Sequence, residues 1–254
     1  MRLEGKIAAI TGGGGGIGRE AALLFAKEGA TLLILENDQK SGEAVVEEIK
    51  EKGGEAQLYH LDISDEVAVA KTFKEIEEQY KKIDVLYNNA SVFWGKKDGP
   101  IDQLDMTVFE RIVKINLFGL AYCSKYAIPL MKRGGGSIIN TSSSAGVIGI
   151  PKCDAYTASK GATVSLTRSM AVEYGPYNIR VNCIAPAAIR TPMVAESNLN
   201  DPEFDEEHFL TAGTPLRRWG LPEEIANIAL FLASDESAYL NGAIIVADGG
   251  ITIS

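Results

Sequence analysis

The chain has 254 residues, of which 46% are hydrophobic and 23% charged, a composition typical of a globular protein. Asp and Glu outnumber Lys and Arg by 34 to 25, and the formal net charge of -9 argues against nucleic-acid binding. Two histidines and three widely spaced cysteines argue against a Ser-His-Asp hydrolase, a disulfide framework and a metal site. We find no signal-peptide pattern and no apolar stretch long enough for a bilayer, so we expect a cytoplasmic protein without a membrane partner.

Short β-branched runs alternate with helical patterns along the chain. In order, they predict strand 7–11, helix 17–29, strand 31–35, helix 41–53, strand 57–62, helix 66–80, strand 84–88, helix 106–131, strand 137–142, helix 156–174, strand 179–186, a helix from Pro222 and strand 243–247. This alternation predicts an α/β fold, with a doubly wound, seven-stranded parallel sheet flanked by helices. We expect a single domain over residues 1–254. An insertion over residues 191–214 interrupts the alternation, and we interpret it as a substrate loop.

A run of five glycines, Gly12 to Gly16, follows the first predicted strand and leads through Ile17 and Gly18 into the first helix. Glycine lets a ligand approach the backbone closely, and the free amides at a helix start bind phosphate groups. A flexible turn is the alternative, but the position between a strand and a helix favours the pyrophosphate of a dinucleotide. The next residue, Arg19, is not the lysine that an ATP-hydrolysing loop requires.

The second predicted strand leads to Glu36. A carboxylate at this point can accept hydrogen bonds from the ribose hydroxyls of a dinucleotide and would repel a 2′-phosphate. Neither Asn37 nor Asp38 supplies a positive charge that would neutralise such a phosphate. The sequence therefore favours NAD over NADP as cofactor, and the alternative is a solvated acid at the end of a strand.

Three polar residues are expected to meet at the carboxyl edge of the sheet. Tyr156 and Lys160 lie four residues apart on one helix face, and Ser143 follows the preceding strand. A nearby ammonium stabilises a phenolate and lowers its pKa, so Tyr156 can exchange a proton with the oxygen of an alcohol or ketone. Ser143 can form a hydrogen bond with the same oxygen.

These motifs, including the Thr-Gly-x-x-x-Gly-x-Gly loop from Thr11, resemble the single-domain branch of the short-chain dehydrogenase/reductase family over essentially the whole chain. The resemblance implies a Rossmann-type fold, a homotetramer and NAD(H)-dependent interconversion of a secondary alcohol and a ketone. It also implies that Asn116 completes a catalytic tetrad with Ser143, Tyr156 and Lys160. The implied cofactor-binding residues are Gly12, Gly16, Ile17, Gly18, Glu36, Asp62, Ile63, Asn89, Ala90, Tyr156, Lys160, Pro186, Ile189 and Thr191. Two small residues depart from the family pattern, which has glycine at the positions of Ser91 and Ala187.

Apolar residues dominate the segments expected beside Tyr156 and predict a small-molecule site for a hydrophobic or cyclic alcohol or ketone. The predicted substrate-binding residues are Ser143, Phe93, Trp94, Ile150 and Met193. Basic pairs at 96–97 and 217–218 leave a 3-oxoacyl carrier-protein reductase open, and polar residues at 198, 200 and 201 leave a sugar 1-dehydrogenase open. A dinucleotide-binding sensor or scaffold is the non-enzymatic alternative.

Overall fold

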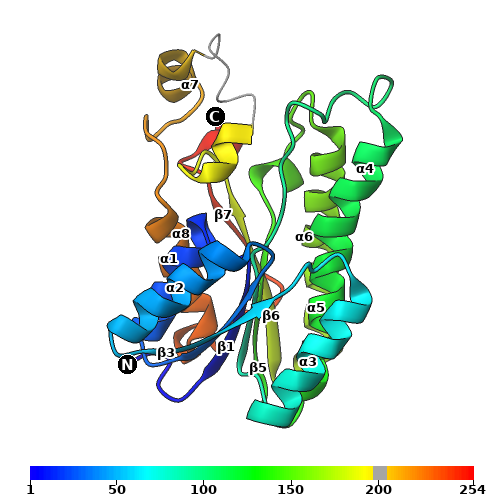
Figure 1. Cartoon of the computed structure of the whole chain (residues 1–254). Helices are drawn as coiled ribbons and strands as arrows, with labels where there is room; N and C mark the ends of the chain where they lie inside the picture. Colours follow the sequence, from blue (N-terminus) through cyan, green and yellow to red (C-terminus); the bar gives the residue numbers. More distant parts are fainter. Residues whose placement is uncertain (197–204) are drawn as a thin grey trace.

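The computed structural model describes residues 1–196 and 205–254. Seven parallel strands form one sheet in the order β3-β2-β1-β4-β5-β6-β7 (Figure 1). The chain reverses its direction of winding between β1 and β4, so the predicted doubly wound Rossmann-type fold is confirmed. The strands are β1 (Ile7–Thr11), β2 (Thr31–Glu36), β3 (Glu55–His60), β4 (Val85–Asn88), β5 (Gly136–Thr141), β6 (Ile179–Pro186) and β7 (Ile244–Ala247).

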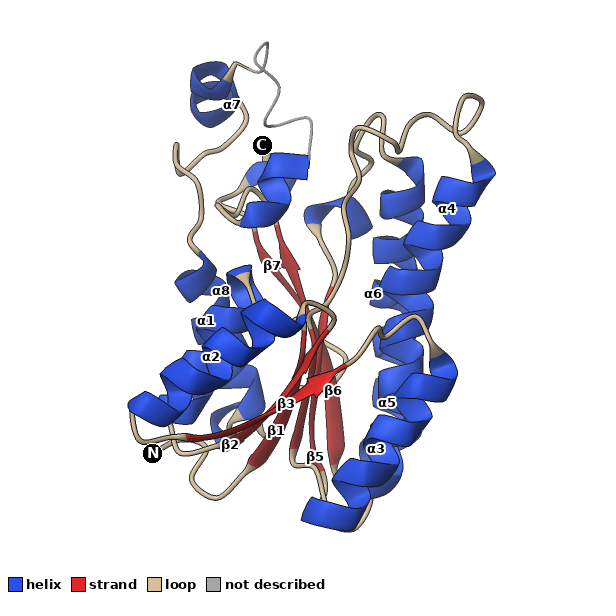
Figure 2. Ribbon diagram, in the orientation of Figure 1, coloured by secondary structure: helices blue, strands red, loops and turns tan. Residues whose placement is uncertain are grey.

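Helices cover both faces of the sheet (Figure 2). Helices α1, α2 and α8 pack on one face, and α3, α5 and α6 pack on the other. No helix in the described part of the chain is long and apolar enough to cross a membrane. The helices are α1 (Gly16–Lys27), α2 (Gln39–Glu51), α3 (Glu66–Tyr80), α4 (Met106–Val113), α5 (Leu120–Met131), α6 (Asp154–Tyr174), α7 (Glu206–Ala212) and α8 (Pro222–Ala233).

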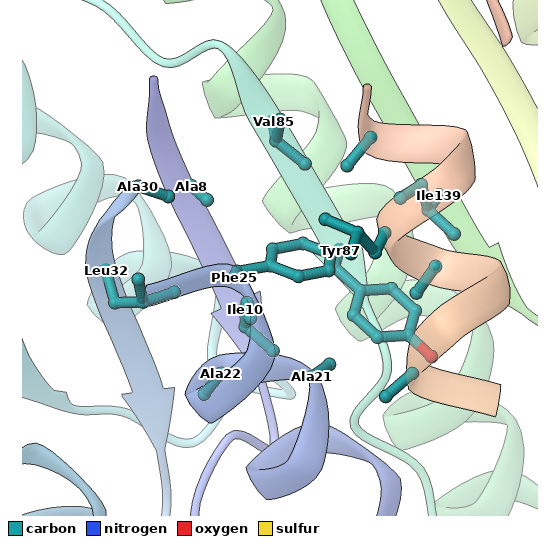
Figure 3. Close-up of a cluster of buried hydrophobic side chains, with 14 of the residues drawn as sticks. Ala8, Ile10, Ala21, Ala22, Phe25, Ala30, Leu32, Val85, Tyr87 and Ile139 are labelled. Atoms are coloured by element: carbon teal, nitrogen blue, oxygen red, sulfur yellow. The ribbon is translucent and has the colours of Figure 1, made fainter. Parts of the chain in front are cut away.

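The buried side chains of the strands alternate between these two helical layers. Ala8 and Ile10 of β1 lie in the cluster formed with α1, α2 and α8, whereas Ala9 lies in the cluster on the opposite face. In the first cluster, the rings of Phe25 and Tyr87 stack with their centroids 6.5 Å apart (Figure 3). Because both faces are covered, the central strands β1, β2 and β4 are mostly apolar and buried.

Two predicted helices differ from the structure in ways that affect the site. A π-helical turn, Lys114–Gly119, interrupts the helix expected over residues 106–131. The sequence did not predict this turn, because apolar periodicity does not encode the extra residue that it contains. Helix α6 begins at Asp154, two residues before the predicted start, and this places Tyr156 in its first turn. The other predicted boundaries shift by at most two residues.

The insertion over residues 191–214 begins with a 3₁₀ turn, Pro192–Glu196, and ends with α7. Its central polar residues at 198, 200 and 201, which we considered for sugar binding, lie outside the described residues. The described parts lie beyond the carboxyl ends of the strands (Figure 2) and contribute to the lining of one cavity together with the loops that follow β1, β4 and β5.

Candidate active site

A cavity of about 1010 Å³ extends along the carboxyl edge of the sheet. Its walls come from the loops after β1 to β6, at the place where open α/β sheets bind ligands. Most of the predicted site residues line this cavity: Gly12, Gly16, Ile17, Glu36, Asp62, Ile63, Asn89, Ala90, Phe93, Ser143, Ile150, Tyr156, Pro186, Ile189, Met193 and Thr191. The predicted residues that do not line it are Gly18, Trp94, Asn116 and Lys160.

The glycine loop brings the backbone to the cavity and packs tightly behind it. Gly12 has a φ of +65°, and a Cβ there would lie 2.9 Å from the Cα atom of Ala90. Gly18 lies on the far side, where a Cβ would lie only 2.0 Å from the carbonyl oxygen of Gly12. Helix α1 starts at Gly16 without a side-chain cap, so its first amides remain available to an anion. The loop therefore fits the pyrophosphate of a dinucleotide.

The carboxylate of Glu36 is oriented by three backbone amides. One oxygen accepts a hydrogen bond from Gly14 N at 2.9 Å, and the other accepts from Asn37 N at 2.8 Å and Asp38 N at 3.0 Å. The guanidinium of Arg19, in the first turn of α1, is engaged by Glu20 and Glu48 and does not line the cavity. A fixed negative charge thus lies at this end of the cavity.

Arg111 of α4, which was not predicted from the sequence, also lines the cavity near the end of β3. Its guanidinium donates to Ser64 Oγ at 2.9 Å and lies 3.4 Å from the carboxylate of Asp62. The two residues are 49 positions apart in the chain, so no local pattern links them. Arg111 and Asp62 together form a polar wall beside Ile63.

Tyr156 and Lys160 lie next to each other on α6, as their spacing predicted, but their environments differ. Tyr156 borders the cavity, and Lys160 lies behind it, with Nζ 5.5 Å from the centre of the Tyr156 ring. Lys160 is 2% exposed and donates from Nζ to the carbonyl oxygen of Thr141 at 2.9 Å. The Lys160 ammonium therefore lies behind the tyrosine ring, and a backbone carbonyl holds it there.

The protonation behaviour of this pair differs from the expectation. Burial raises the pKa of Tyr156 to about 12, and a hydrogen bond with Ser143 acts in the opposite direction. Burial lowers the pKa of Lys160 to about 8. The predicted depression of the Tyr156 pKa by Lys160 is therefore not found among the groups of the chain itself: desolvation raises this pKa, and the group that acts against it is Ser143. At neutral pH the tyrosine is a phenol and the lysine carries a charge.

Asn116 lies in the π-helical turn and holds the loop after β4. Its side-chain oxygen accepts from Val92 N at 2.8 Å, and its side-chain nitrogen donates to Val92 O at 3.0 Å. The same nitrogen lies 3.2 Å from Ser159 Oγ on α6. Asn116 thus connects the loop that carries Phe93 to the helix that carries Tyr156.

The comparisons with known proteins agree with this geometry. A family model described as "Enoyl-(Acyl carrier protein) reductase" matches residues 12–252, nearly the whole chain. The chain belongs to the short-chain dehydrogenase/reductase family. The family predicted from the motifs is thereby confirmed, and the chain is an oxidoreductase whose family uses a nicotinamide dinucleotide and acts on CH–OH groups.

Three similar proteins illustrate the range of the short-chain dehydrogenase/reductase family. The 3-oxoacyl-[acyl-carrier-protein] reductase FabG of Thermotoga maritima is 37% identical over 100% of both chains. Among solved structures, levodione reductase is 35% identical over 100% of both chains, with a TM-score of 0.94. A putative NAD(P)-dependent gluconate 5-dehydrogenase of Beutenbergia cavernae, solved with bound NADP, is 32% identical over 99% of this chain and 98% of that chain, with a TM-score of 0.92.

In this member of the short-chain dehydrogenase/reductase family, apolar side chains line the end of the cavity beside Tyr156. The ring of Phe93 lies 4.7 Å from the ring of Tyr156, centroid to centroid. Trp219 and Phe209 also line the cavity, and their ring centroids lie 5.6 Å apart. Trp219 was not predicted, because it reaches the site through a bridge between Gly220 and Ile189 that joins distant parts of the chain. The other apolar lining residues at this end include Ile150, Pro151, Met193 and Val194.

Trp94, which we predicted to bind the substrate, does not line the cavity. Its side chain packs in a separate cluster with Leu104, Ile112 and Ala155, away from the cavity. Lys97 Nζ lies 5.2 Å above the Trp94 ring. A hydrophobicity pattern could not separate Phe93 from Trp94, because adjacent residues in an irregular loop have no fixed relation to either surface.

Proposed function

We propose that this chain is an NAD(H)-dependent oxidoreductase that interconverts a neutral secondary alcohol and its ketone, with Tyr156 as the acid/base. One observation carries the proposal. Tyr156 and Ser143 border the same cavity as the uncapped start of α1, and the buried cation of Lys160 lies behind the tyrosine. This arrangement supports proton transfer to or from an oxygen placed against Tyr156 while a dinucleotide occupies the other end.

Each residue of the group has a role in the reduction of a ketone. Tyr156, a phenol at neutral pH, donates a proton to the carbonyl oxygen, and Ser143 donates a hydrogen bond to the same oxygen. The charge of Lys160 stabilises the phenolate that remains. Asn116 positions the Val92 backbone and so the wall around the substrate. The nicotinamide dinucleotide, when bound, supplies or accepts the hydride.

The preference for NAD rests on Glu36. Its carboxylate has acceptor capacity left for ribose hydroxyls and opposes a 2′-phosphate. Among the described lining residues, Arg111 is the one basic side chain, and it is engaged by Ser64 and Asp62. The remaining cofactor contacts that we propose are those of the glycine loop, Asp62, Ile63, Asn89, Ala90, Pro186, Ile189 and Thr191.

The substrate end favours a neutral, apolar molecule. The charged side chains among the described lining residues, Glu36, Asp38, Asp62 and Arg111, all lie at the cofactor end. A carboxylate or phosphate on the substrate would therefore lose its hydration without gaining a counter-charge. A cyclic ketone fits the aromatic and aliphatic walls around Phe93 and Ile150. Levodione reductase, with its high structural similarity, supports this class.

A 3-oxoacyl carrier-protein reductase is the second candidate, since FabG of Thermotoga maritima matches the full chain. Such an activity needs cations that attract an acidic carrier protein. Arg218 is paired with Glu224 at 2.6 Å, and Lys97 lies over Trp94. The ion pair offsets the charge of Arg218, and this favours the small neutral substrate. The homotetramer, the single-domain organisation and the cytoplasmic location stay predictions.

The proposal is tested by following the absorbance of the reduced cofactor with a panel of substrates. The panel pairs NAD(H) and NADP(H) with cyclic ketones and alcohols, an aldose, gluconate and a 3-oxoacyl thioester. We expect the highest kcat/KM with NADH and a cyclic ketone. Turnover confined to the thioester would favour the carrier-protein activity, and tight NADH binding without any turnover would favour a sensor.

A further inference from the structure

The start of the helix that carries Tyr156 is capped by a distant part of the chain. Helix α6 begins at Asp154, and the residue before it, Cys153, forms no side-chain cap. The first amides of a helix have no partner within the helix and need one from elsewhere when they are buried. Ala155 is fully buried and Tyr156 nearly so.

Asp98 supplies these partners from the loop after β4. One carboxylate oxygen accepts from Ala155 N at 3.1 Å, and the other accepts from Tyr156 N at 2.9 Å. The first oxygen also accepts from Gly99 N at 2.8 Å, and the amide of Asp154 donates to Gly99 O at 3.3 Å. Three successive amides at the start of α6 thus bind two successive residues of this loop.

The carboxylate of Asp98 is deeply placed and has no salt-bridge partner among the described residues. Asp98 is 8% exposed. A buried carboxylate without a cation is costly unless backbone donors and a helix dipole satisfy it. Here three amides and the amino end of α6 do so.

The same loop carries Phe93, whose ring lies against the ring of Tyr156. The amide of Asp98 donates to Trp94 O at 2.8 Å, so a compact turn joins the carboxylate to the residue next to Phe93. The Tyr156 residue is therefore held at two points by one loop, through its backbone amide and through its ring.

We propose that Asp98 is a positioning residue for Tyr156. Its carboxylate, which comes from a distant loop, caps α6 and thereby fixes the position of the Tyr156 phenol relative to the substrate wall of the cavity. This inference rests on the proposed function of Tyr156 as the acid/base. A displacement of about 1 Å between reacting groups can lower a rate by about 10²-fold. Loss of the cap thus lowers kcat, while the dinucleotide end of the cavity, which Asp98 does not contact, keeps its affinity.

The test compares D98A and D98N with D65A as the matched control. Asp65 is the N-cap residue of α3, where one oxygen of its exposed carboxylate accepts from Val67 N at 3.0 Å and Ala68 N at 3.2 Å, and it does not line the cavity. The measurements are kcat at a temperature where every variant is folded, the NADH dissociation constant from fluorescence, Tm and amide hydrogen exchange. The exchange experiment monitors Ala155 and Tyr156 and does not depend on turnover.

We expect D98A to lower kcat by about 10²-fold, to leave NADH affinity within about twofold and to expose both amides to exchange. D98N has one amide oxygen where the native residue has two acceptors, so it retains part of kcat and protects one amide. If D98A does not fold, the kcat and the amide exchange of D98N still test the inference. D65A lowers Tm and keeps kcat.

A wild-type kcat in the D98 variants at a reduced Tm would overturn the inference and leave the proposed function intact. An equal loss of kcat in D65A would also overturn it, since general destabilisation would then explain both. Absence of wild-type turnover with every substrate would instead reject the proposed function. In that case, unchanged exchange of Ala155 and Tyr156 in D98N would still reject the cap.

Discussion

Lys160 Nζ donates a hydrogen bond to the carbonyl oxygen of Thr141, 2.9 Å away, from a side chain that is almost completely buried. Thr141 ends β5, so the sheet itself holds the ammonium behind Tyr156. A backbone carbonyl compensates only part of the hydration that a buried ammonium loses, and the pKa of Lys160 falls to about 8 through burial. The buried ammonium of Lys160 therefore lowers the stability of the fold, but it lies where it can stabilise a phenolate of Tyr156.

The first prediction concerns the pH dependence of stability in K160M. The folded pKa of about 8 lies below the ordinary value of 10.5, so between these values the unfolded chain binds more protons at this group. The free energy of unfolding of the wild type should thus rise, relative to K160M, by about 2 kcal/mol between pH 8 and about pH 10. Urea denaturation of both proteins measures it. A difference that does not change with pH would show that Lys160 is solvated.

The sequence predicts those parts of the fold and site that depend on short spacings. Gly12 directly follows β1 and Gly16 begins α1, and Tyr156 and Lys160 are one helical turn apart, so local geometry brings each pair to its place. The family resemblance added Asn116, which no spacing indicates.

The parts that were missed depend on contacts between distant segments. Arg111 reaches Asp62 over 49 residues, and Asp98 reaches Tyr156 over 58. Trp94, which we predicted in the substrate wall, packs against Ala155, and Trp219, which was not predicted, enters the cavity lining beside a bridge at Gly220. Tertiary packing decides such choices, and a single sequence does not record it.

The second prediction is that Y156F loses turnover and keeps the cofactor. The phenylalanine ring keeps its packing against Phe93, but no hydroxyl remains to exchange a proton, so kcat should fall by about 10²- to 10⁴-fold. Fluorescence titration should give an NADH dissociation constant close to that of the wild type. Y59F is the matched control, because burial also raises the pKa of Tyr59 to about 12, although that residue lies outside the cavity lining. Comparable activity of the two variants would refute the role of Tyr156.

The third prediction concerns cofactor choice in E36Q. The substitution keeps the shape of the side chain and removes the charge that opposes a 2′-phosphate, so the ratio of kcat/KM for NADP over NAD should rise about tenfold. E43Q removes an equal charge from the exposed face of α2, where Glu43 bonds only Gln39 in the described structure, and should leave the ratio unchanged. Equal ratios in E36Q and wild type would mean that another group selects the cofactor.

The last prediction separates two adjacent aromatic residues. Phe93 lines the cavity and touches Tyr156, whereas Trp94 packs with Leu104 and Ile112. F93A should therefore raise KM for a cyclic ketone by about tenfold, because a large apolar contact with the substrate is lost. W94A should lower Tm by removing a packed side chain, with little change in KM. Steady-state kinetics and thermal denaturation of both variants measure these effects. A larger rise of KM in W94A than in F93A would indicate that Trp94 contacts the substrate. The loop would then have to rearrange when the substrate binds.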